Sequence, residues 1–578
     1  MKLNDALKAV AAARSLPVAH DGFLACGFEP LHLPAFLQAH FQSRQPGGAL
    51  RVAQGLYGDL LGNVERARAA GVGVAWVVLE WSDLDPRLGF RSTGPWGGER
   101  QADVIEGVRA RLDALSAAIG RLAESTLVVV APPSVAFPWF GHTSGWQASE
   151  AELELELSLA RWVRALSGAA RVRVLHSGRL AAHSPAAARS DARGELATGF
   201  PYALEHASVL AGALIELAFA PPPKKGLITD LDDTLWAGIV GEVGVSGVHW
   251  SLAERAQVHG LYQSLLRQLA DAGVLLAIAS KNEKDVVEAA LARADLLVEG
   301  AVFFPVSVSW GPKSDAVSAI LRSWNIAADA VVVVDDSRME LEEIRRQHAG
   351  ITALEFSPRD PRAALELLSQ LRDLFGKPTL QAEDKLRLAS IRSAASFEQE
   401  ARRSDLHGFL AGLDGAVAFD ARKRDGSARL LELLNKTNQF NLNGLRVSES
   451  EWVRLLAAPD SVVIGVAYTD RYGALGTIGV VVGKMAEPGV LSLEHWVLSC
   501  RAFSRRIEEH TLRYLFGLCG VATIRLAYRE TERNGPFREL LGRLGLDPLP
   551  AHPLDVEREH FERVVGHLPH RDVVAEGA

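Results

Sequence analysis

The sequence predicts an α/β protein of three domains: a first α/β domain, a central domain built on a parallel sheet, and a last domain of the α+β class. Its 578 residues are too many for one hydrophobic core. Short apolar runs alternate with helical stretches in the first two domains, as in layered α/β folds. Two Pro-containing breaks, "APPPKKG" at 220–226 and "GKP" at 376–378, divide the chain into residues 1–220, 221–375 and 376–578.

The overall composition excludes several classes of protein. The net charge is -8 and the basic residues are scattered, so nucleic acid is not an expected partner. The three cysteines, Cys26, Cys500 and Cys519, lack the spacing of a disulfide framework or a zinc site, which fits a reducing cytoplasm. No apolar run approaches the ~20 residues of a membrane span. We therefore expect a soluble cytoplasmic protein that does not bind membranes.

The first domain alternates predicted strands with Ala- and Leu-rich helical stretches. Strands are predicted within 74–81 ("VAWVVLEW"), 126–133 ("TLVVVAPP") and 170–177 ("ARVRVLHS"), and a helix over 150–168. This pattern predicts an α/β layer structure.

The central domain carries polar side chains where three predicted strands end. The strands are "GLITD" at 226–230, "VLLAIAS" at 274–280 and "AVVVVDD" at 330–336. Parallel strands present their carboxyl ends at one edge of a sheet, where ligands bind. We expect the following residues to share that edge: Asp230, Asp232, Ser280, Lys313, Asp335 and Asp336.

The types of residue at this edge are those of a phosphoryl-transfer site that uses Mg²⁺. Crowded carboxylates repel one another unless a cation neutralises them, and an oxygen-only cluster suits Mg²⁺. Asp230 is then the nucleophile and Asp232 the general acid/base. Asp335 and Asp336, together with Asp230 and Asp232, are the expected metal ligands. The alternative is a helix capped by Asp232 or Thr234 after a strand, which explains one Asp but not three matching strand ends.

These strings resemble the motifs of the haloacid dehalogenase superfamily: "DLDDTLW", "SKN", Lys313 and "DDSRME". The resemblance implies a Rossmann-like fold and a phosphate-binding set consisting of Thr234, Ser280, Lys281, Asn282 and Lys313. The longer string "DLDDTLWAGIVGEVG" resembles the FkbH-like proteins of subfamily IIIC, which load glyceryl units from 1,3-bisphosphoglycerate onto acyl carrier proteins. The short insertion after the first motif predicts an uncapped site.

The third domain carries two further strings that resemble the same family. They are "LLNKTNQFNLNGLR" at 433–446 and "VLSCRAFSRRIEEHTL" at 497–512. The resemblance implies an acetyltransferase-like (GNAT-like) α+β domain in which Cys500 holds the glyceryl group. It also implies acyl or pantetheine contacts from Asn438, Gln439, Asn441 and Arg501. An Asn-rich turn or a buried thiol would give the same residues without that role.

Two departures from the family pattern limit these expectations. Ser504 and Arg506 replace the two glycines of a pyrophosphate-binding loop, which argues against coenzyme A binding there. The first domain resembles SGNH hydrolases, yet it has neither their G-D-S nor their D-x-x-H motif. Cys26 stands near the nucleophile position, where a buried structural thiol is the simpler interpretation. We expect a non-catalytic first domain.

The sequence thus predicts a Mg²⁺-dependent glyceryl transferase/phosphatase of polyketide-type biosynthesis. Its substrates would be 1,3-bisphosphoglycerate and an acyl carrier protein. The alternatives are a simple phosphatase of a small phosphorylated metabolite, and a non-catalytic scaffold that docks carrier proteins.

Overall fold

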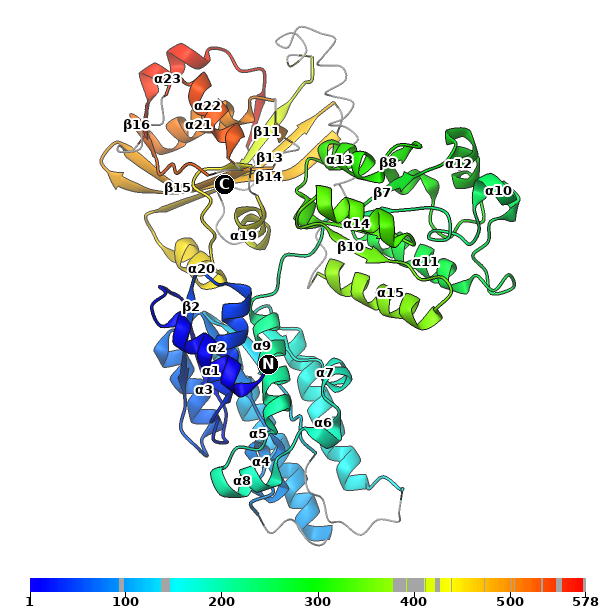
Figure 1. Cartoon of the computed structure of the whole chain (residues 1–578). Coiled ribbons are helices and arrows are strands. Elements are labelled where there is room, and N and C mark those ends of the chain that lie inside the picture. Colours follow the sequence, from blue (N-terminus) through cyan, green and yellow to red (C-terminus); the bar gives the residue numbers. More distant parts are fainter. Residues whose placement is uncertain are drawn as a thin grey trace. The chain divides into compact units, whose positions relative to one another are not determined.

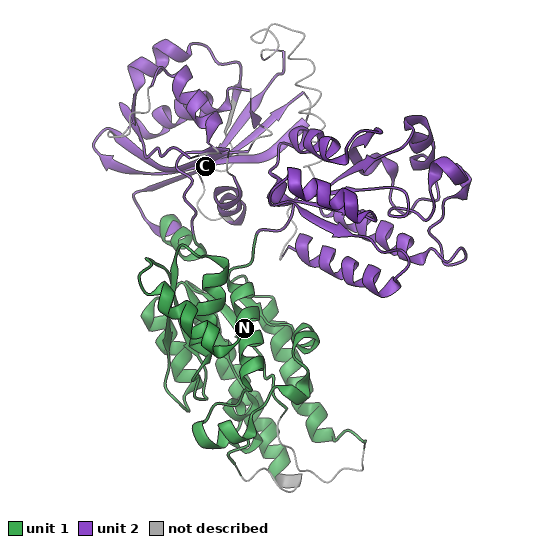
Figure 2. Cartoon of the chain, viewed as in Figure 1, with its two compact units in different colours: residues 1–221, 448–455 green, residues 222–447, 456–578 purple. Residues whose placement is uncertain are grey.

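The chain forms two compact units in the computed structural model (Figure 2). One unit contains residues 1–221 and 448–455, and the other contains residues 222–447 and 456–578. The structure describes residues 1–92, 98–136, 146–377, 391, 410, 412–421, 427–437, 439–471, 473–499, 502–503, 505–531, 534–546 and 554–574. The predicted fold class is confirmed, because two parallel sheets flanked by helices are followed by a mixed sheet. The division into three domains stays a prediction.

The first unit is built on a five-stranded parallel sheet of order β2-β1-β3-β4-β5. Its strands are β1 (Val18–Ala25), β2 (Ala49–Gln54), β3 (Val74–Val78), β4 (Leu127–Ala131) and β5 (Val172–Val174). Its helices are α1 (Leu3–Ala13), α2 (Leu33–Arg44), α3 (Leu60–Ala70), α4 (Trp81–Leu84), η1 (Pro86–Leu88), α5 (Gly98–Leu122), α6 (Glu150–Ser167), α7 (Ser177–His183), η2 (Ala186–Ala188), α8 (Ala192–Thr198) and α9 (Leu204–Ala218).

Alternation along the strands gives this sheet two buried faces. Trp76 and Val78 of β3 pack with α2 and α9 on one face, and Ala75 and Val77 pack with α3, α5 and α6 on the other (Figure 1). Successive side chains of a strand point to opposite faces, so an entirely apolar strand needs helices on both sides.

The first sheet of the second unit is also five-stranded and parallel, with order β10-β9-β6-β7-β8. The strands are β6 (Gly226–Thr229), β7 (Leu275–Ser280), β8 (Phe303–Val308), β9 (Val331–Asp335) and β10 (Thr352–Glu355). Helices α11 (Gln257–Asp271), α12 (Lys284–Leu291) and α15 (Pro361–Phe375) cover one face. Helices α13 (Lys313–Trp324) and α14 (Arg338–Gln347) cover the other. The shorter elements are α10 (Val240–Val243), η3 (Val245–Gly247), η4 (Gly300–Val302) and η5 (Ala328–Ala330).

The second sheet of this unit is mixed and has the order β17-β16-β15-β14-β13-β11-β18, with β12 paired to β15. Its strands are β11 (Ala416–Asp420), β12 (Phe440–Asn441), β13 (Ser461–Asp470), β14 (Gly473–Glu487), β15 (Val490–Leu498), β16 (Thr523–Leu526), β17 (Leu554–Glu557) and β18 (Arg571–Val574). The helices of this part are α19 (Ser427–Lys436), α21 (Ile507–Cys519), α22 (Gly535–Arg543) and α23 (Arg558–Val565). Most of α20 (Glu449–Ala457) belongs to the first unit. Strands and helices share one apolar core that includes Trp496, Leu512 and Phe537.

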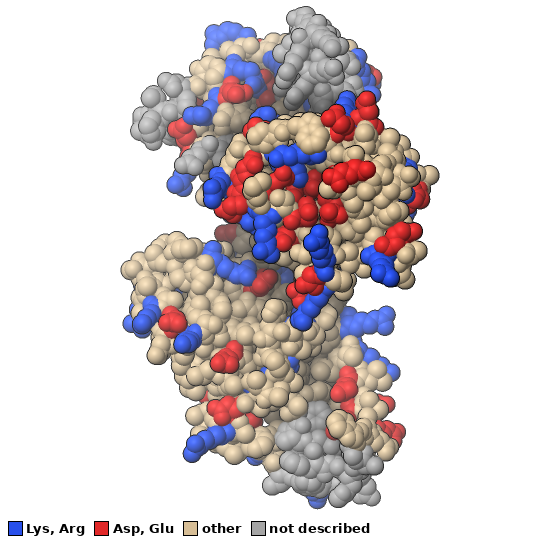
Figure 3. All heavy atoms as spheres, turned by 45° about the vertical axis from the view of Figure 1, so that its right-hand side comes forward, with Lys and Arg blue, Asp and Glu red and all other residues tan. Residues whose placement is uncertain are grey.

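The surface carries both signs of charge. On the face that Figure 3 shows, acidic and basic side chains are interspersed, as the scattered basic residues of the sequence indicate. Within the described part of the chain, no helix combines the length and the apolar character that a membrane crossing needs.

Candidate active site

Two neighbouring strands of the central sheet, the parallel sheet β10-β9-β6-β7-β8 of the second unit, end in carboxylates that lie side by side. Thr229 of β6 pairs with Val334 of β9, and the backbone N–H of Asp230 donates to the carbonyl oxygen of Val334 at 3.0 Å. The next residue of each strand is an aspartate, Asp230 on one and Asp335 on the other. The register of the two strands therefore fixes both carboxylates at the same edge.

Three carboxylates at this edge form a group that could hold a metal ion. Single oxygen atoms of Asp230, Asp335 and Asp336 all lie within 4.8 Å of one another. Asp230 and Asp335 are buried, whereas Asp336 is exposed. Carboxylate oxygens are the donors that hard divalent cations prefer, so the residues present fit such an ion.

Lys313 is the cation that the protein itself places among these groups. It begins α13 and is buried, and its Nζ lies 2.6 Å from Oδ2 of Asp335 and 3.0 Å from Oδ1 of Asp230. Burial lowers the pKa of Lys313, but Asp230 and Asp335 raise it, and the net result is a pKa above the ordinary lysine value. Lys313 therefore stays charged and neutralises part of the cluster.

Glu340 belongs to the site although the sequence did not single it out. It lies in the first turn of α14, with Oε2 2.6 Å from Nζ of Lys313 and Oε1 3.0 Å from Nζ of Lys281. Burial raises the pKa of Glu340, but the two lysines lower it more, so the net shift is downward. The signal available in the sequence is its position in "DDSRME", one helical turn beyond the strand-end aspartates.

The charges at this edge do not balance. Four carboxylates, Asp230, Asp335, Asp336 and Glu340, surround two lysines, Lys281 and Lys313. Burial and the nearby charge of Asp230 raise the pKa of Asp336 to about 6. Burial likewise raises the pKa of Asp230 and of Asp335, against the opposing effect of Lys313. The remaining negative charge is what a divalent cation would neutralise.

Asp232 is not among the described carboxylates of this group, and its assignment as a metal ligand stays a prediction. Its Oδ1 accepts hydrogen bonds from Nε1 of Trp236 at 3.0 Å and from the backbone N–H of Val240 at 2.9 Å. Its Oδ2 accepts one from Nδ2 of Asn282 at 2.8 Å. These donors, from its own loop and from the segment after β7, occupy both oxygens of the Asp232 carboxylate.

The remaining residues of the expected phosphate-binding set lie around this edge. Ser280 ends β7 and is buried, and its Oγ accepts a hydrogen bond from Nδ2 of Asn282 at 3.2 Å. Thr234 is fully buried, and its hydroxyl has no hydrogen-bond partner among the described residues. Lys281 is tied to Glu340. That these residues contact phosphate stays a prediction.

Only part of the acyl-binding set of the third domain can be placed. Cys500, Arg501 and Asn438 lie outside the described residues. Gln439 directly precedes β12. Asn441 is buried; its Oδ1 accepts from the backbone N–H groups of Asn443 and Gly444, and its Nδ2 donates to the carbonyl oxygen of Thr437. These bonds are those of a structural Asn turn, and a ligand contact by Asn441 stays a prediction.

Arg505 and Arg506, which follow Cys500 in sequence, have structural partners. Arg505 is buried and its Nε donates to Oδ2 of Asp470 at 3.0 Å. Arg506 donates to the carbonyl oxygen of Val565 at 3.0 Å. A phosphate contact by these two side chains would have to compete with those bonds.

Cys26 behaves as the buried thiol that the sequence favoured. It is 3% exposed, and its Sγ donates to the carbonyl oxygen of Phe28 at 3.4 Å. Burial raises the pKa of this thiol well above its usual range, and Asp83 and Glu29 raise it further. A thiol that stays protonated is a poor nucleophile.

Comparison with known proteins shows a fold and not a family. No protein-family model and no curated protein matches the chain. The solved structure of the N-terminal part of the protein BF1531 from Bacteroides fragilis, which contains a phosphatase domain and is complexed with Mg, matches with a TM-score of 0.52 and 17% identity. The match covers 66% of this chain and 100% of that one. At this identity the likeness shows a common fold alone.

A second solved structure matches too weakly to indicate a shared fold. It is a GCN5-related glucosamine N-acetyltransferase region in a fungal multi-domain β-N-acetylglucosaminidase, with 10% identity, 94% of this chain and 67% of that chain covered, and a TM-score of only 0.16.

Proposed function

We propose that the central domain is a Mg²⁺-dependent phosphatase in which Asp230 is the nucleophile. The observation that carries this proposal is the excess of buried carboxylate over lysine at the carboxyl edge of the sheet. The likeness in fold to a protein part with a phosphatase domain that was crystallised with Mg supports it. Asp230, Asp335 and Asp336 would hold the ion.

The reaction would proceed in two displacements at phosphorus. A carboxylate oxygen of Asp230 bonds to phosphorus while the bond to the leaving oxygen breaks, and Asp232 gives that oxygen a proton. A water molecule then attacks the phosphorus, its proton passes to Asp232, and the acyl-phosphate bond to Asp230 breaks, which releases inorganic phosphate. When bound, Mg²⁺ would neutralise negative charge on the phosphate oxygens.

The neighbouring side chains would orient these groups. Lys313 lies within ion-pair distance of Asp230 and can also face a phosphate oxygen. The donors from Trp236, Val240 and Asn282 hold the Asp232 carboxylate in one orientation. Groups held before the substrate arrives do not have to be ordered at the moment of reaction.

We further propose that the substrate is 1,3-bisphosphoglycerate, and that the full chain passes its glyceryl group through Cys500 to an acyl carrier protein in the cytoplasm, for polyketide-type biosynthesis. The support for this finer assignment is the resemblance of the strings around Asp230, Asn438 and Cys500 to the FkbH-like family. In this scheme the first domain is an SGNH-like, non-catalytic domain, and Asn438, Gln439, Asn441 and Arg501 lie along the acyl chain. A simple phosphatase needs only the central domain.

Intact-mass analysis separates these two functions. The protein is mixed with Mg²⁺, freshly generated 1,3-bisphosphoglycerate and a carrier protein bearing its phosphopantetheine arm, and phosphate release is measured in parallel. The transferase predicts a glyceryl adduct on the carrier; phosphate release with no adduct on either protein would leave only the phosphatase. Cys500→Ala should abolish the adduct on the enzyme, while the matched control Cys519→Ala should not. No phosphate release at all would contradict both functions.

A further inference from the structure

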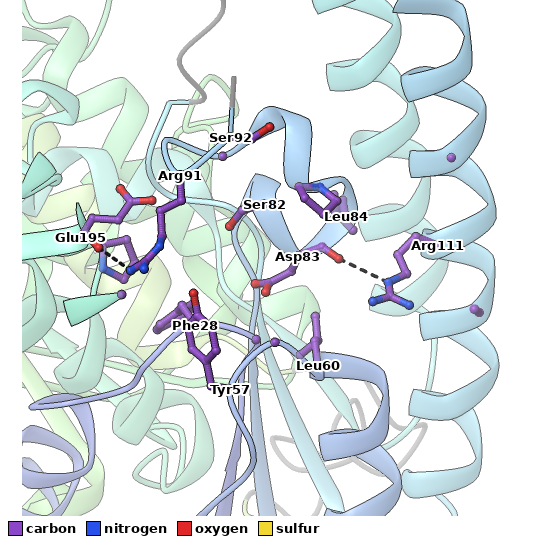
Figure 4. Close-up of a pocket in the computed structure, with 18 of the residues that line it drawn as sticks. Phe28, Tyr57, Leu60, Ser82, Asp83, Leu84, Arg91, Ser92, Arg111 and Glu195 are labelled. Carbon is purple, nitrogen blue, oxygen red and sulfur yellow. Dashed lines mark hydrogen bonds between the residues drawn. The ribbon is translucent and has the colours of Figure 1, made fainter. Parts of the chain in front are cut away.

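The first unit has a cavity at the carboxyl edge of its own parallel sheet. It has a volume of about 590 Å³ and is lined by loops that follow β1, β2 and β3, by one side of α5, and by residues between 195 and 201. This is where open α/β sheets bind ligands, and the volume is that of a small-molecule site. Figure 4 shows side chains of several of these segments converging on it.

Asp83 of α4 places a carboxyl group in the cavity. Its Oδ2 accepts the backbone N–H of Glu80 at 2.8 Å, whereas no described residue donates to its Oδ1. A Cβ atom on Gly27 would lie only 1.9 Å from that Oδ1, so a glycine is needed at position 27 for the carboxyl group to take this place. The close approach of the chain after β1 therefore shapes the floor of the cavity.

Arg111 of α5 supplies the opposite charge from the neighbouring wall. Its Nε donates to the backbone carbonyl oxygen of Asp83 at 3.3 Å, drawn as a dashed line in Figure 4. It does not pair with the Asp83 carboxylate, and among the described residues nothing accepts from its two terminal nitrogens. Asp83 and Arg111 thus line one cavity with hydrogen-bonding atoms that the protein does not use.

The other side of the cavity is amphipathic. Arg91 donates to the carbonyl oxygen of Glu195 at 2.9 Å. Arg91 and the exposed ring of Tyr57 both approach Gly199, whose φ is +84°. The side chains of Phe28, Leu60 and Leu84 add apolar surface. A ligand here would meet aromatic and aliphatic carbon between two guanidinium groups.

A buried network holds the end of β3 and so fixes Asp83. Both oxygens of Glu80 accept hydrogen bonds: Oε1 from the Tyr202 hydroxyl at 2.7 Å and the Ser134 hydroxyl at 2.8 Å, and Oε2 from the backbone N–H groups of Ser134 and Val135. The Ser134 hydroxyl also lies 2.9 Å from Nε2 of His206. Glu80, whose backbone N–H donates to the Asp83 carboxyl group, is thereby anchored to residues that lie 54 or more positions away in the sequence.

We propose that this cavity binds a hydroxylated organic acid, with its carboxylate or phosphate on the Arg111 guanidinium and a hydroxyl group on the Asp83 carboxyl. A guanidinium offers a planar pair of donors that matches a carboxylate or phosphate. The carboxyl oxygen accepts a hydroxyl, and the apolar wall covers the carbon chain. Cys26 is buried beneath the loop and does not line the cavity, so the site binds and does not form a thioester. The inference is independent of the function proposed for the central domain.

Isothermal titration calorimetry on the full chain without divalent cations tests this site. The probes are D-glycerate, glycerol 3-phosphate and inorganic phosphate: the first two identify the preferred acid group, and the third shows whether the hydroxylated chain contributes. At least one organic probe should bind saturably and more tightly than inorganic phosphate. Arg111→Gln should weaken that binding about tenfold or more, because it removes a charged hydrogen-bond donor.

The matched control is Arg109→Gln, on the same helix, because Arg109 pairs with Glu154 and does not line the cavity. Ala114→Leu should also weaken binding, since the larger side chain fills the cavity from the same helix without removing charge. This variant tests the site if Arg111→Gln does not fold. The proposal is overturned if no organic probe binds saturably, or if the cavity variants bind as tightly as Arg109→Gln.

Discussion

The buried acids at the edges of the two parallel sheets have different kinds of hydrogen-bond and ion-pair partners. At the edge of the first sheet, Glu80 is surrounded by neutral donors, two hydroxyl groups and two backbone N–H groups. At the edge of the central sheet, three aspartates and Glu340 share two lysines. The acid at the edge of the first sheet thus has a structural role, because neutral groups satisfy its hydrogen bonds. The same edge of the central sheet is suited to a cation, because acids outnumber bases there.

Asp230→Asn tests the comparison with the largest expected effect. It preserves the shape of the side chain and replaces the nucleophilic carboxylate with a neutral, weakly nucleophilic amide, so phosphate release should fall at least about 10³-fold. Steady-state assays with Mg²⁺ and a phosphate ester measure this loss. Asp285→Asn, at an exposed position of α12, is the control and should retain activity. Equal activity of both variants would remove Asp230 from the chemistry.

Lys313→Met tests whether the central cluster depends on its internal cation. It leaves buried carboxylates without their partner, so the free energy of unfolding should fall by about 3–5 kcal/mol, and added Mg²⁺ should restore part of it. Urea unfolding with and without Mg²⁺ measures both effects. Lys284→Met removes an exposed ion pair with Glu288 and should cost less than about 1 kcal/mol. If the two variants lose equal stability, Lys313 does not neutralise the buried carboxylates.

Mg²⁺ itself should stabilise the wild-type protein. A ligand that binds only the folded state adds about 2.7 kcal/mol at a concentration a hundred times its dissociation constant. Asp336→Asn removes one carboxylate of the metal group, and it should shift the Mg²⁺ dependence of the unfolding midpoint to higher concentration. Glu80→Gln, in the first unit, should leave that dependence unchanged. An unchanged midpoint in wild type at any Mg²⁺ concentration would exclude the metal site.

The burial of Glu80 in the first unit should make the free energy of unfolding depend on pH. Burial raises the pKa of Glu80 to about 7, above its usual value of about 4.3 in an unfolded chain. The folded state therefore holds a proton that the unfolded state has lost, and the contribution of Glu80 to stability falls as pH rises between these values. The free energy of unfolding of Glu80→Gln, measured relative to that of the wild type, should therefore rise by roughly 2 kcal/mol between pH 5 and pH 8.

The opposing titration of His206 does not obscure this comparison. Burial lowers the pKa of His206 to about 4, so the folded state loses stability as pH falls below the usual histidine value. His206 is present in both proteins, and its contribution cancels in the difference. Urea unfolding at several pH values gives that difference; a constant value across pH would mean that Glu80 is ionised in the folded state throughout.

Sequence patterns predicted the strands that carry the candidate site because those strands are apolar on both faces. β6, β7 and β9 are buried along their whole lengths, and each ends in a polar residue. β1 was not predicted, since only the second half of "VAHDGFLA" is buried: Val18 and Ala19 are exposed, and the polar His20 and Asp21 are half-buried. It lies inside the first sheet because β2 and β3 pair with it on either side.

By itself, the sequence determined the fold class and the edge at which Asp230, Lys313 and Asp335 meet, because buried strands and the polar residues at their carboxyl ends can be recognised from local patterns of apolar residues. Only the tertiary structure decided where each side chain turns. Asp232 faces Asn282, fifty positions away, and Glu80 faces Tyr202, at a separation of 122. Such bonds depend on which distant segments the packed sheets bring together, and no local pattern specifies them.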